Sequence, residues 1–432
     1  MNKLRELSNR VREILQAKGV EEYSFELRQI EKKELNTENT AFSLYRTVFD
    51  DEISVDVLVD GRLGSSSGSD LTDEGIEKTV ENALQGAASG MADAANSIAE
   101  KQAEEVFISG TQEADMELFY TRLSELLSTV EREYPQIKVL QLIADHTKTH
   151  RLYANSNGTL FESYDGLYSV MMEYAGNDGE KTTGLSYGGA STHELTKPLI
   201  ELGAFRKNLE DAVASLNLTS FEGKFEGTVI FTPDCLGMFL FMLSNNYLMS
   251  QVVMDGTSQW LDRVGEQVSS DKVTFSLKAE DERLVETEPY TADGYKAENV
   301  PVIEKGILKN QILSLYAAKK TGRPVTKNTS RSLVMEPGDK TLSEMIASVK
   351  RGLIVGGFSG GRPGVSGDFS GVAKNSFYIE DGKIKGAVNE TMINGNLAKV
   401  FQNVTAVSKE LCLDGSSALP YLQTEGIVIS GK

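Results

Sequence analysis

The sequence predicts an α+β protein in which N-terminal domains of mixed antiparallel sheet and helices precede a β-rich, barrel-like C-terminal domain. Between residues 23 and 63, and again between residues 137 and 174, apolar and polar residues alternate as in half-buried antiparallel strands. Amphipathic helical segments flank both stretches. Beyond residue 219, short apolar runs separated by glycine-rich turns follow one another, a spacing typical of sandwiches and barrels.

Length and composition predict more than one folded domain. The chain has 432 residues, of which 40% are hydrophobic, with 39 glycines and only 9 prolines, so it is neither disordered nor confined to a single small core. We expect an N-terminal α+β domain over residues 1–100, a second helix–meander–helix domain over 101–220, and the β-rich domain over 221–432.

Charge and cysteine usage exclude several functional classes. The net charge of −19 repels phosphate backbones and anionic lipid, so a direct nucleic-acid partner is not expected. The two cysteines, Cys235 and Cys412, supply neither a disulfide framework nor a zinc cluster. The N-terminal residues contain no apolar signal segment, and together these features predict a cytoplasmic protein.

The elements of the N-terminal half follow from periodicity and turn residues. A surface helix is expected over residues 1–20, and Asp60-Gly61 is a tight hairpin turn between two alternating strands. Residues 90–104, rich in alanine and small polar residues, predict a linker or a poorly packed helix. Further helices are expected over 72–88, 115–134 and 198–216.

The run from Cys235 to Met254 contains no charged residue and no histidine. Thr232 is a suitable N-cap with Pro233 at the first helical position, which predicts a helix from about 233 to 251. A membrane span is disfavoured, because Ser244, Asn245 and Asn246 would lie at its centre. We therefore expect a core helix that is buried nearly all round.

Three patterns are only weak indications of a metal, nucleotide or catalytic site. His146 and His150 are four residues apart, but on a strand this spacing separates them by roughly 13 Å, which disfavours a shared metal. Residues 356–371 contain seven glycines but no nucleotide-loop signature, so they indicate tight turns and a backbone that an extended peptide could approach. The Gly-x-Ser-x-Gly matches at 64–68 and 357–361 lack a strand-to-helix elbow.

Several stretches of the sequence resemble the TldD/PmbA family, often labelled modulator of DNA gyrase. The most specific match is Val355–Gly371, which ends in Gly-Asp-Phe-Ser-Gly, followed by residues 376–384 and by Ile393-Asn-Gly-Asn-Leu. Shorter matches lie at 62–65, 155–158, 265–268 and 306–320, so the resemblance covers nearly the whole chain.

The resemblance implies one of two kinds of subunit. The TldD kind carries His-Glu-x-x-x-His on the helix after the central strand, which binds zinc together with a later cysteine. Counting from Gly256-Thr-Ser258 places that motif on residues 241–246, where Phe241 and Asn246 replace the histidines and Met242 the glutamate. The sequence around Cys412 does not match the later cysteine. The chain is therefore similar to the PmbA (TldE) kind, for which we expect no metal, no cofactor and no catalytic residue.

The function that the resemblance implies is that of a non-catalytic subunit in a cytosolic metallopeptidase complex acting on unfolded or extended peptides. The expected partner is a TldD-type zinc subunit in a heterodimer, or a second copy in a homodimer, with no membrane partner. Two alternatives remain open: a homodimeric peptide-binding scaffold, and a hydrolase using Glu266, Asp368 or Ser370. The candidate substrate-binding residues are Asn245, Asn246, Gly360, Gly361, Arg362, Asp368 and Ser370. For Arg362 and Asp368 an internal salt bridge is the competing interpretation.

Overall fold

Two separate β-sheets organise the chain in the computed structural model, which describes residues 3–328 and 332–431. The first sheet has seven strands in the order β3-β2-β1-β5-β6-β4, with β7 paired to β6. Its strands and the accompanying helices are α1 (Lys3–Ala17), β1 (Glu22–Glu38), β2 (Ala41–Val59), β3 (Arg62–Gly68), α2 (Asp73–Ser89), β4 (Glu105–Gly110), α3 (Met116–Glu133), β5 (Ile137–Asn155), β6 (Leu160–Gly176), β7 (Ser186–Thr192), the short 3-10 helix η1 (Leu199–Glu201) and α4 (Phe205–Ala214).

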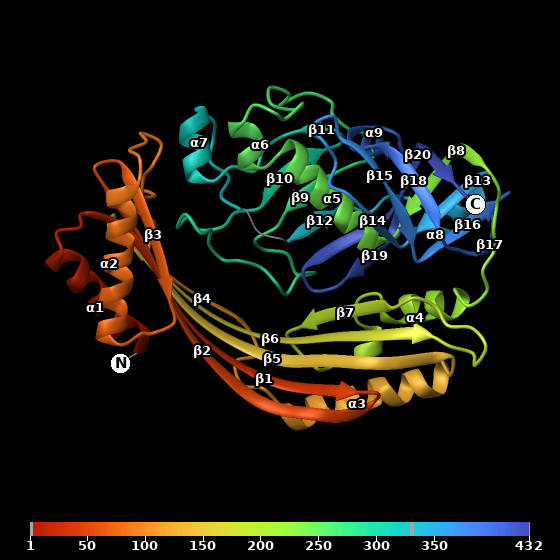
Figure 1. Ribbon diagram of the computed structural model, residues 1–432, viewed down its shortest axis with the longest axis horizontal. Coiled ribbons are helices and arrows are strands. Elements are labelled where there is room, and N and C mark those ends of the chain that lie inside the picture. The colour runs from red at the N-terminus through yellow and green to blue at the C-terminus, as the bar shows by residue number, and fades with distance from the viewer. Residues whose placement is uncertain (1–2, 329–331, 432) are drawn as a thin grey trace.

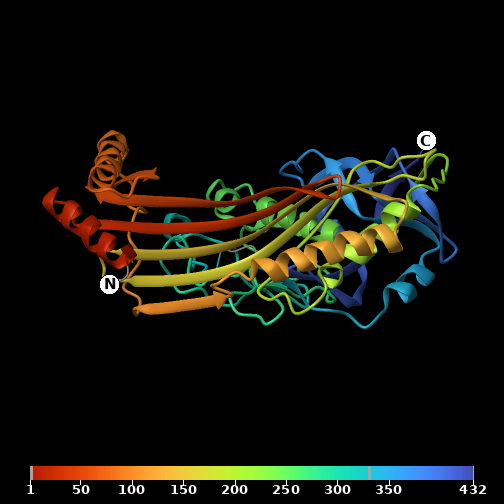
Figure 2. The same cartoon turned by 90° about the horizontal axis from the view of Figure 1, so that it is seen from below.

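The four long strands of this sheet curve beneath the C-terminal half (Figure 1). Seen from below, α1 and α3 lie at opposite ends of the sheet's convex face (Figure 2). The alternation explains this placement: Leu27 and Leu152 join the cluster under α1 and α2, whereas Leu35, Ala144 and Tyr168 join the cluster under α3. The sheet also joins the first two expected units, because β1 pairs with β5 along most of its length. The boundary at residue 100 stays a prediction.

Turn chemistry fixes the hairpins of the first sheet. Asp60 and Gly61 both have positive φ, +50° and +74°, which confirms the predicted tight turn between β2 and β3. The turn between β1 and β2 uses Asn39 and Thr40 in the same left-handed region, at +47° and +69°. Threonine rarely adopts this conformation, so the sequence contains no clear turn signal there.

The second sheet has thirteen strands, and the path β11-β10-β9-β12-β20-β8-β13-β16-β17 runs through it. The remaining elements of the chain are β8 (Lys224–Phe231), α5 (Pro233–Tyr247), α6 (Ser250–Met254), β9 (Phe275–Leu277), β10 (Val300–Glu304), β11 (Ile307–Leu308), α7 (Leu315–Thr321), β12 (Leu333–Met335), α8 (Leu342–Ser348), β13 (Arg351–Val355), β14 (Gly357–Gly360), β15 (Asp368–Lys374), β16 (Ser376–Glu380), β17 (Lys383–Val388), β18 (Thr391–Asn396), α9 (Leu397–Gln402), β19 (Val404–Leu413) and β20 (Ser417–Ser430). The α+β class is confirmed.

The expected barrel-like form of the C-terminal domain is not confirmed, because the described sheet is open. Its path ends at β11 and β17, which do not pair with each other. The centre is instead covered on both faces. Val229 and Phe231 of β8 join the cluster that contains α5, whereas Ile230 between them packs with Met345 of α8. Two covered faces explain why this strand is a continuous apolar run.

Side chains of the linker and of β1 and β4 tie the two halves together. Residues 90–104 contain neither helix nor strand, as one of the two interpretations predicted. Asp93 accepts hydrogen bonds from Lys320 at 2.5 Å, from the Ala95 amide at 2.9 Å and from Tyr316 at 3.0 Å, and these contacts lower its pKa to about 2. Glu100 accepts one from Tyr295 at 2.6 Å. None of the helices among the described residues has the length and apolar character that crossing a bilayer requires.

Candidate functional site

Helix α5 begins as the sequence predicts but ends earlier. The Thr232 side chain accepts from the Cys235 amide, and Pro233 occupies the first turn. The amides of Leu248 and Met249 both donate to the Ser244 carbonyl at 2.9 Å, so the regular helical repeat is lost there. A separate helix, α6, then starts at Ser250. The predicted single helix to residue 251 is therefore two helices.

The prediction that this helix is buried nearly all round is wrong. Met238 is 39% exposed and Phe241 is 63% exposed, and Asn245 lies one turn further along the same face. We call these three residues the α5 stripe. The face of α5 opposite the stripe is buried among Phe231, Phe358 and other residues of the core of the C-terminal half. The sequence does not reveal the exposed stripe, because apolar residues occupy both the exposed and the buried face of α5.

The residues at the expected zinc-motif positions do not form a metal-binding set. Phe241 and Met242 offer no ligand, and Asn246 has a buried amide nitrogen without a hydrogen-bond partner in the described chain. Zinc is bound by imidazole, thiolate or carboxylate groups, which none of these three residues supplies. Among residues 3–328 and 332–431, no group of three or more His, Cys, Asp or Glu side chains could hold a metal ion. The family's zinc therefore does not fit this helix.

The glycine-rich segment packs on α5 through Phe358 and Phe369, and its loop meets the end of the helix at Gly367. Strands β14 and β15 are paired, and the loop between them reaches Gly367, whose φ is +82°. A Cβ at Gly367 would lie 2.0 Å from the hydroxyl oxygen of Tyr247, the last residue of α5. The expected residues Gly360, Gly361, Arg362, Asp368 and Ser370 are all exposed along this segment.

We expect Gly367→Ala to destabilise the protein by about 2–3 kcal/mol, because the left-handed backbone and the Tyr247 hydroxyl both oppose a side chain. Gly361→Ala is the matched control in the same loop, since a Cβ there meets nothing within 4 Å. Its expected effect is within about 0.5 kcal/mol. Urea midpoints of the two variants compare them, and equal midpoints would contradict the contact.

The Arg362–Asp368 salt bridge, the alternative to substrate contact, does not form among the described residues. Asp368 accepts instead from Asn396 Nδ2 at 2.9 Å and from Ser366 Oγ at 2.9 Å, and these two bonds lower its pKa. Arg362 makes no ion pair with any residue of the described chain. The three residues of the hydrolase alternative, Glu266, Asp368 and Ser370, are not joined to one another by any hydrogen bond in the described part of the chain. Glu266 pairs with Arg263 at 2.9 Å.

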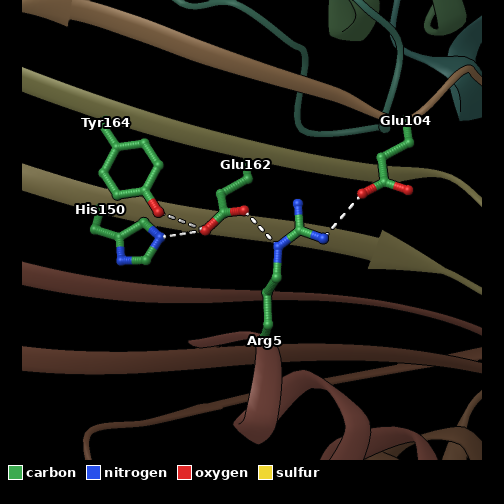
Figure 3. A network of polar contacts seen from close by, with 5 residues as sticks. All are labelled: Arg5, Glu104, His150, Glu162 and Tyr164. Carbon is green, nitrogen blue, oxygen red and sulfur yellow. Dashed lines mark hydrogen bonds and ion pairs between the residues drawn. The ribbon is translucent and has the colours of Figure 1, made fainter. Parts of the chain in front are cut away.

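All three histidines lie in the first sheet or directly after it. His150 and the buried Glu162 face the convex side, where Glu162 accepts hydrogen bonds from His150 Nε2 at 2.8 Å, Tyr164 at 2.7 Å and Arg5 Nε at 2.7 Å (Figure 3). Burial raises the pKa of Glu162, but these three donors outweigh it and hold the pKa below its usual value. Arg5 also bonds the exposed Glu104 at 3.0 Å. The Glu162 network therefore attaches α1 to the sheet.

The concave side of the same sheet borders a cavity of about 540 Å³ that the sequence did not predict. One wall comes from β1, β4, β5 and β6, and the other from residues 279–297 of the C-terminal half. Arg151, Ser163, Asp165, Ser109, Tyr164 and Lys296 are among its lining residues. No sequence signal could have found it, because its walls are more than a hundred residues apart in the chain.

A serine, a histidine and an aspartate meet at the edge of this cavity, but not as a catalytic triad. Ser109 Oγ lies 3.2 Å from His193 Nε2. The Asp165 carboxyl lies near both side chains, and burial raises its pKa. A triad needs the carboxylate on the second histidine nitrogen, so that it orients the imidazole. No hydrogen bond joins Asp165 to His193 in the described chain, and this arrangement therefore does not activate Ser109.

Comparisons with known proteins find relatives along most of the chain. Residues 223–431 match the model of the PmbA/TldA metallopeptidase C-terminal domain, and residues 26–87 match that of PmbA/TldA metallopeptidase domain 1. The metalloprotease PmbA of Escherichia coli O157:H7 is 23% identical over 402 residues, which cover 87% of this chain and 86% of that protein. A metalloprotease of Methanothermobacter thermautotrophicus is 24% identical over 284 residues, and the match spans 60% of its length.

Solved structures share the fold across the whole chain. TldE from Thermococcus kodakarensis superposes with a TM-score of 0.84 at 20% identity, covering 98% of this chain and 100% of that one. A candidate modulator of DNA gyrase from Bacteroides thetaiotaomicron superposes with a TM-score of 0.86 at 22% identity, covering 100% of both. Since two family models, relatives named PmbA and these folds all coincide, the chain belongs to the TldD/PmbA family, whose members include proteins named metalloproteases.

Proposed function

We propose that this chain is the non-catalytic, metal-free subunit of a cytosolic TldD/TldE-type metallopeptidase complex that acts on unfolded or extended peptides. The observation that carries the proposal is the composition of α5. Where the resemblance places two histidines and a glutamate, this helix has Phe241, Asn246 and Met242. A partner subunit would then supply the zinc and its activated water.

The α5 stripe supports an interface with such a partner. Phe241 is 63% exposed in a protein of net charge −19, and Met238 lies beside it. Exposed phenylalanine and methionine on one helical face are typical of the apolar centre of a protein–protein interface. We infer that the zinc subunit covers the stripe, because the resemblance places the helix of the metal motif here.

The adjacent strand β14 supports peptide binding. In the described chain β14 pairs only with β15, so its other edge carries unpaired backbone groups. Ser359 and Gly360 on this strand are exposed, and so are Asp368 and Ser370 on its neighbour. An extended peptide can add to such an edge through main-chain hydrogen bonds, while side chains beside it select the residues. This arrangement requires no fixed sequence and suits unfolded substrates.

The test is reconstitution with a TldD-type zinc protein from the same cells. We expect the isolated chain to contain no stoichiometric zinc and to cleave no peptide, and we expect cleavage to appear when the two proteins are mixed. Phe241→Glu should weaken the association at least about tenfold, because it places a charge in the apolar centre. Phe49→Glu is the matched control, since Phe49 is 73% exposed on β2 of the first sheet.

Three results would overturn the proposal. Zinc near one atom per isolated chain would show that it holds a metal. Peptide cleavage by the isolated chain in the presence of a chelator would favour the hydrolase alternative. Failure of any TldD-type protein to associate, with a stable homodimer instead, would favour the scaffold alternative.

A further inference from the structure

We infer that the cavity between the first sheet and residues 279–297 binds a carboxylate, held by the guanidinium of Arg151. The cavity measures about 540 Å³, which is within the range of small-ligand sites. Its lining comes from the first sheet and from residues 279–297, and α5 and the glycine-rich loop contribute no residue to it. In Figure 1 the C-terminal half lies over the concave side of this sheet. The inference therefore goes beyond the proposed function.

Arg151 is placed and oriented by the fold, and Asp165 acts on it only through its charge, without a hydrogen bond or ion pair in the described chain. Its guanidinium carbon lies 5.2 Å from the centre of the Tyr290 ring, a cation–π contact across the two halves. Tyr290 is only 3% exposed and its hydroxyl donates to Glu26 at 3.3 Å, so the ring beneath the guanidinium is fixed. No hydrogen bond or ion pair joins Arg151 to a residue within 3–328 or 332–431.

The other cations around the cavity are already paired. Arg28 stands opposite Arg151 in the β1–β5 register, and its Nη1 bonds Glu52 at 3.2 Å. Lys296 bonds Glu105 at 2.6 Å. Both add positive potential, but neither has lost its counter-ion. An arginine offers five N–H donors in a planar fork that matches a carboxylate, and those of Arg151 remain free for a ligand.

The remaining walls indicate what else the ligand carries. Phe107, Pro289 and Ala297 supply apolar contact, while Ser163 and Thr149 supply hydroxyls beside Arg151. The Ser163 hydroxyl is buried beside the Tyr290 hydroxyl. It faces the same side of the sheet as Arg151, its cross-strand partner, so it can hydrogen-bond a group bound there. The chemistry fits a small carboxylic acid or the free C-terminus of a short peptide.

Asp165 carries a negative charge that opposes an anionic ligand, so substituting it gives a second test of the carboxylate site. Its carboxyl lines the same cavity, and its neighbours on β5 are Thr149, directly opposite, and Arg151, on the diagonal. A negative charge there weakens the binding of any carboxylate. Removing that charge without changing the shape, as in Asp165→Asn, should tighten the binding.

The experiment is isothermal titration of the full chain with three probes: trialanine, trialanine amide and succinate. We expect saturable binding of the free acids, weakening with added salt, and none of the amide. Tighter binding of trialanine than of succinate identifies a peptide C-terminus, and the reverse identifies a small dicarboxylate. Equal binding of trialanine and its amide would overturn the carboxylate site, as would no saturable binding of any probe.

Variants locate the site. Arg151→Met keeps the stem packed on Tyr290 and should weaken trialanine or succinate at least about tenfold. Arg351→Met is the matched control, because Arg351 also stacks on an aromatic ring, with 3.7 Å to the centre of Phe225, but lies outside the cavity. Thr149→Glu leaves the Arg151–Tyr290 contact in place and supplies an internal carboxylate, so it should abolish binding even if Arg151→Met fails to fold. Unchanged affinity in Thr149→Glu would refute the assignment. The isolated chain suffices for these titrations, so their failure leaves the proposed function untouched.

Discussion

Glu162→Ala is expected to destabilise the protein by about 3–4 kcal/mol, because it removes a buried acceptor shared by three partly buried donors. The Glu162 side chain is 3% exposed and accepts from Arg5, His150 and Tyr164 within 2.7–2.8 Å. The loss should include the docking of α1, whose Arg5 would keep only Glu104 (Figure 3). Urea unfolding followed by circular dichroism measures the total, and hydrogen exchange in residues 3–17 reports the helix.

Glu104→Ala is the matched control, because it removes the other carboxylate bound to the same arginine. The Glu104 side chain is 56% exposed, so its removal should cost no more than about 1 kcal/mol. Equal losses in the two variants would contradict the importance of the buried acceptor.

The same network gives a pH dependence with a defined sign. The pKa of Glu162 is lowered in the folded protein, so its contribution is complete above the unfolded value of about 4.3 and is lost as the pH falls below it. Burial lowers the pKa of His150, so protonation also opposes folding below about pH 6.5. Glu162→Gln should flatten the acid limb of a stability–pH curve. An unchanged acid limb would show that other carboxylates dominate it.

Trp260→Ala should cost about 3–5 kcal/mol, the usual range for emptying a large aromatic site in a core. Trp260 is 1% exposed and stacks on Tyr247 with 4.6 Å between ring centres and 18° between planes. Since Tyr247 is the last residue of α5, the void left by Trp260→Ala would loosen the end of that helix as well as the core. Thermal unfolding by circular dichroism measures the cost without requiring tryptophan fluorescence.

Trp260→Phe serves as the control for aromatic stacking. It keeps a ring against Tyr247 and should lose only about 1–2 kcal/mol through the smaller volume. If alanine and phenylalanine cost the same, the stack contributes nothing beyond filled space, and the predicted difference between them is wrong.

The sequence predicted the parts of the fold that follow from local chemistry. Asp60-Gly61 identified a hairpin because both residues tolerate positive φ, and Thr232-Pro233 identified the start of α5. The same reasoning failed at Asn39-Thr40, where tertiary pairing of β1 and β2 imposes a conformation that threonine disfavours. It also could not show that β1 pairs with β5, because periodicity says which face of a strand is buried and not which strand lies beside it.

Some features of the candidate sites are visible in the sequence and others appear only in the structure. The absence of histidine and glutamate from α5 is visible in the sequence. The exposure of Phe241 is not, because an apolar residue is expected to lie in the core. Asp368 and Arg362 carry opposite charges six residues apart, but the Asn396 amide takes the carboxylate instead. Arg151 gave no signal at all, since its stacking on Tyr290 joins residues 139 positions apart.

The central place of β20 in the second sheet bears on how the protein is made. This strand pairs with β8, β12, β18 and β19, and of these partners β8 and β12 leave the ribosome much earlier. Its partner β8 lies about two hundred positions upstream, and such distant pairing slows folding. The N-terminal sheet can form during translation once β5 and β6 have emerged, but the other half must wait, with apolar strands uncovered, until β20 has been synthesised. That interval is when the nascent chain is most exposed to aggregation and to chaperones.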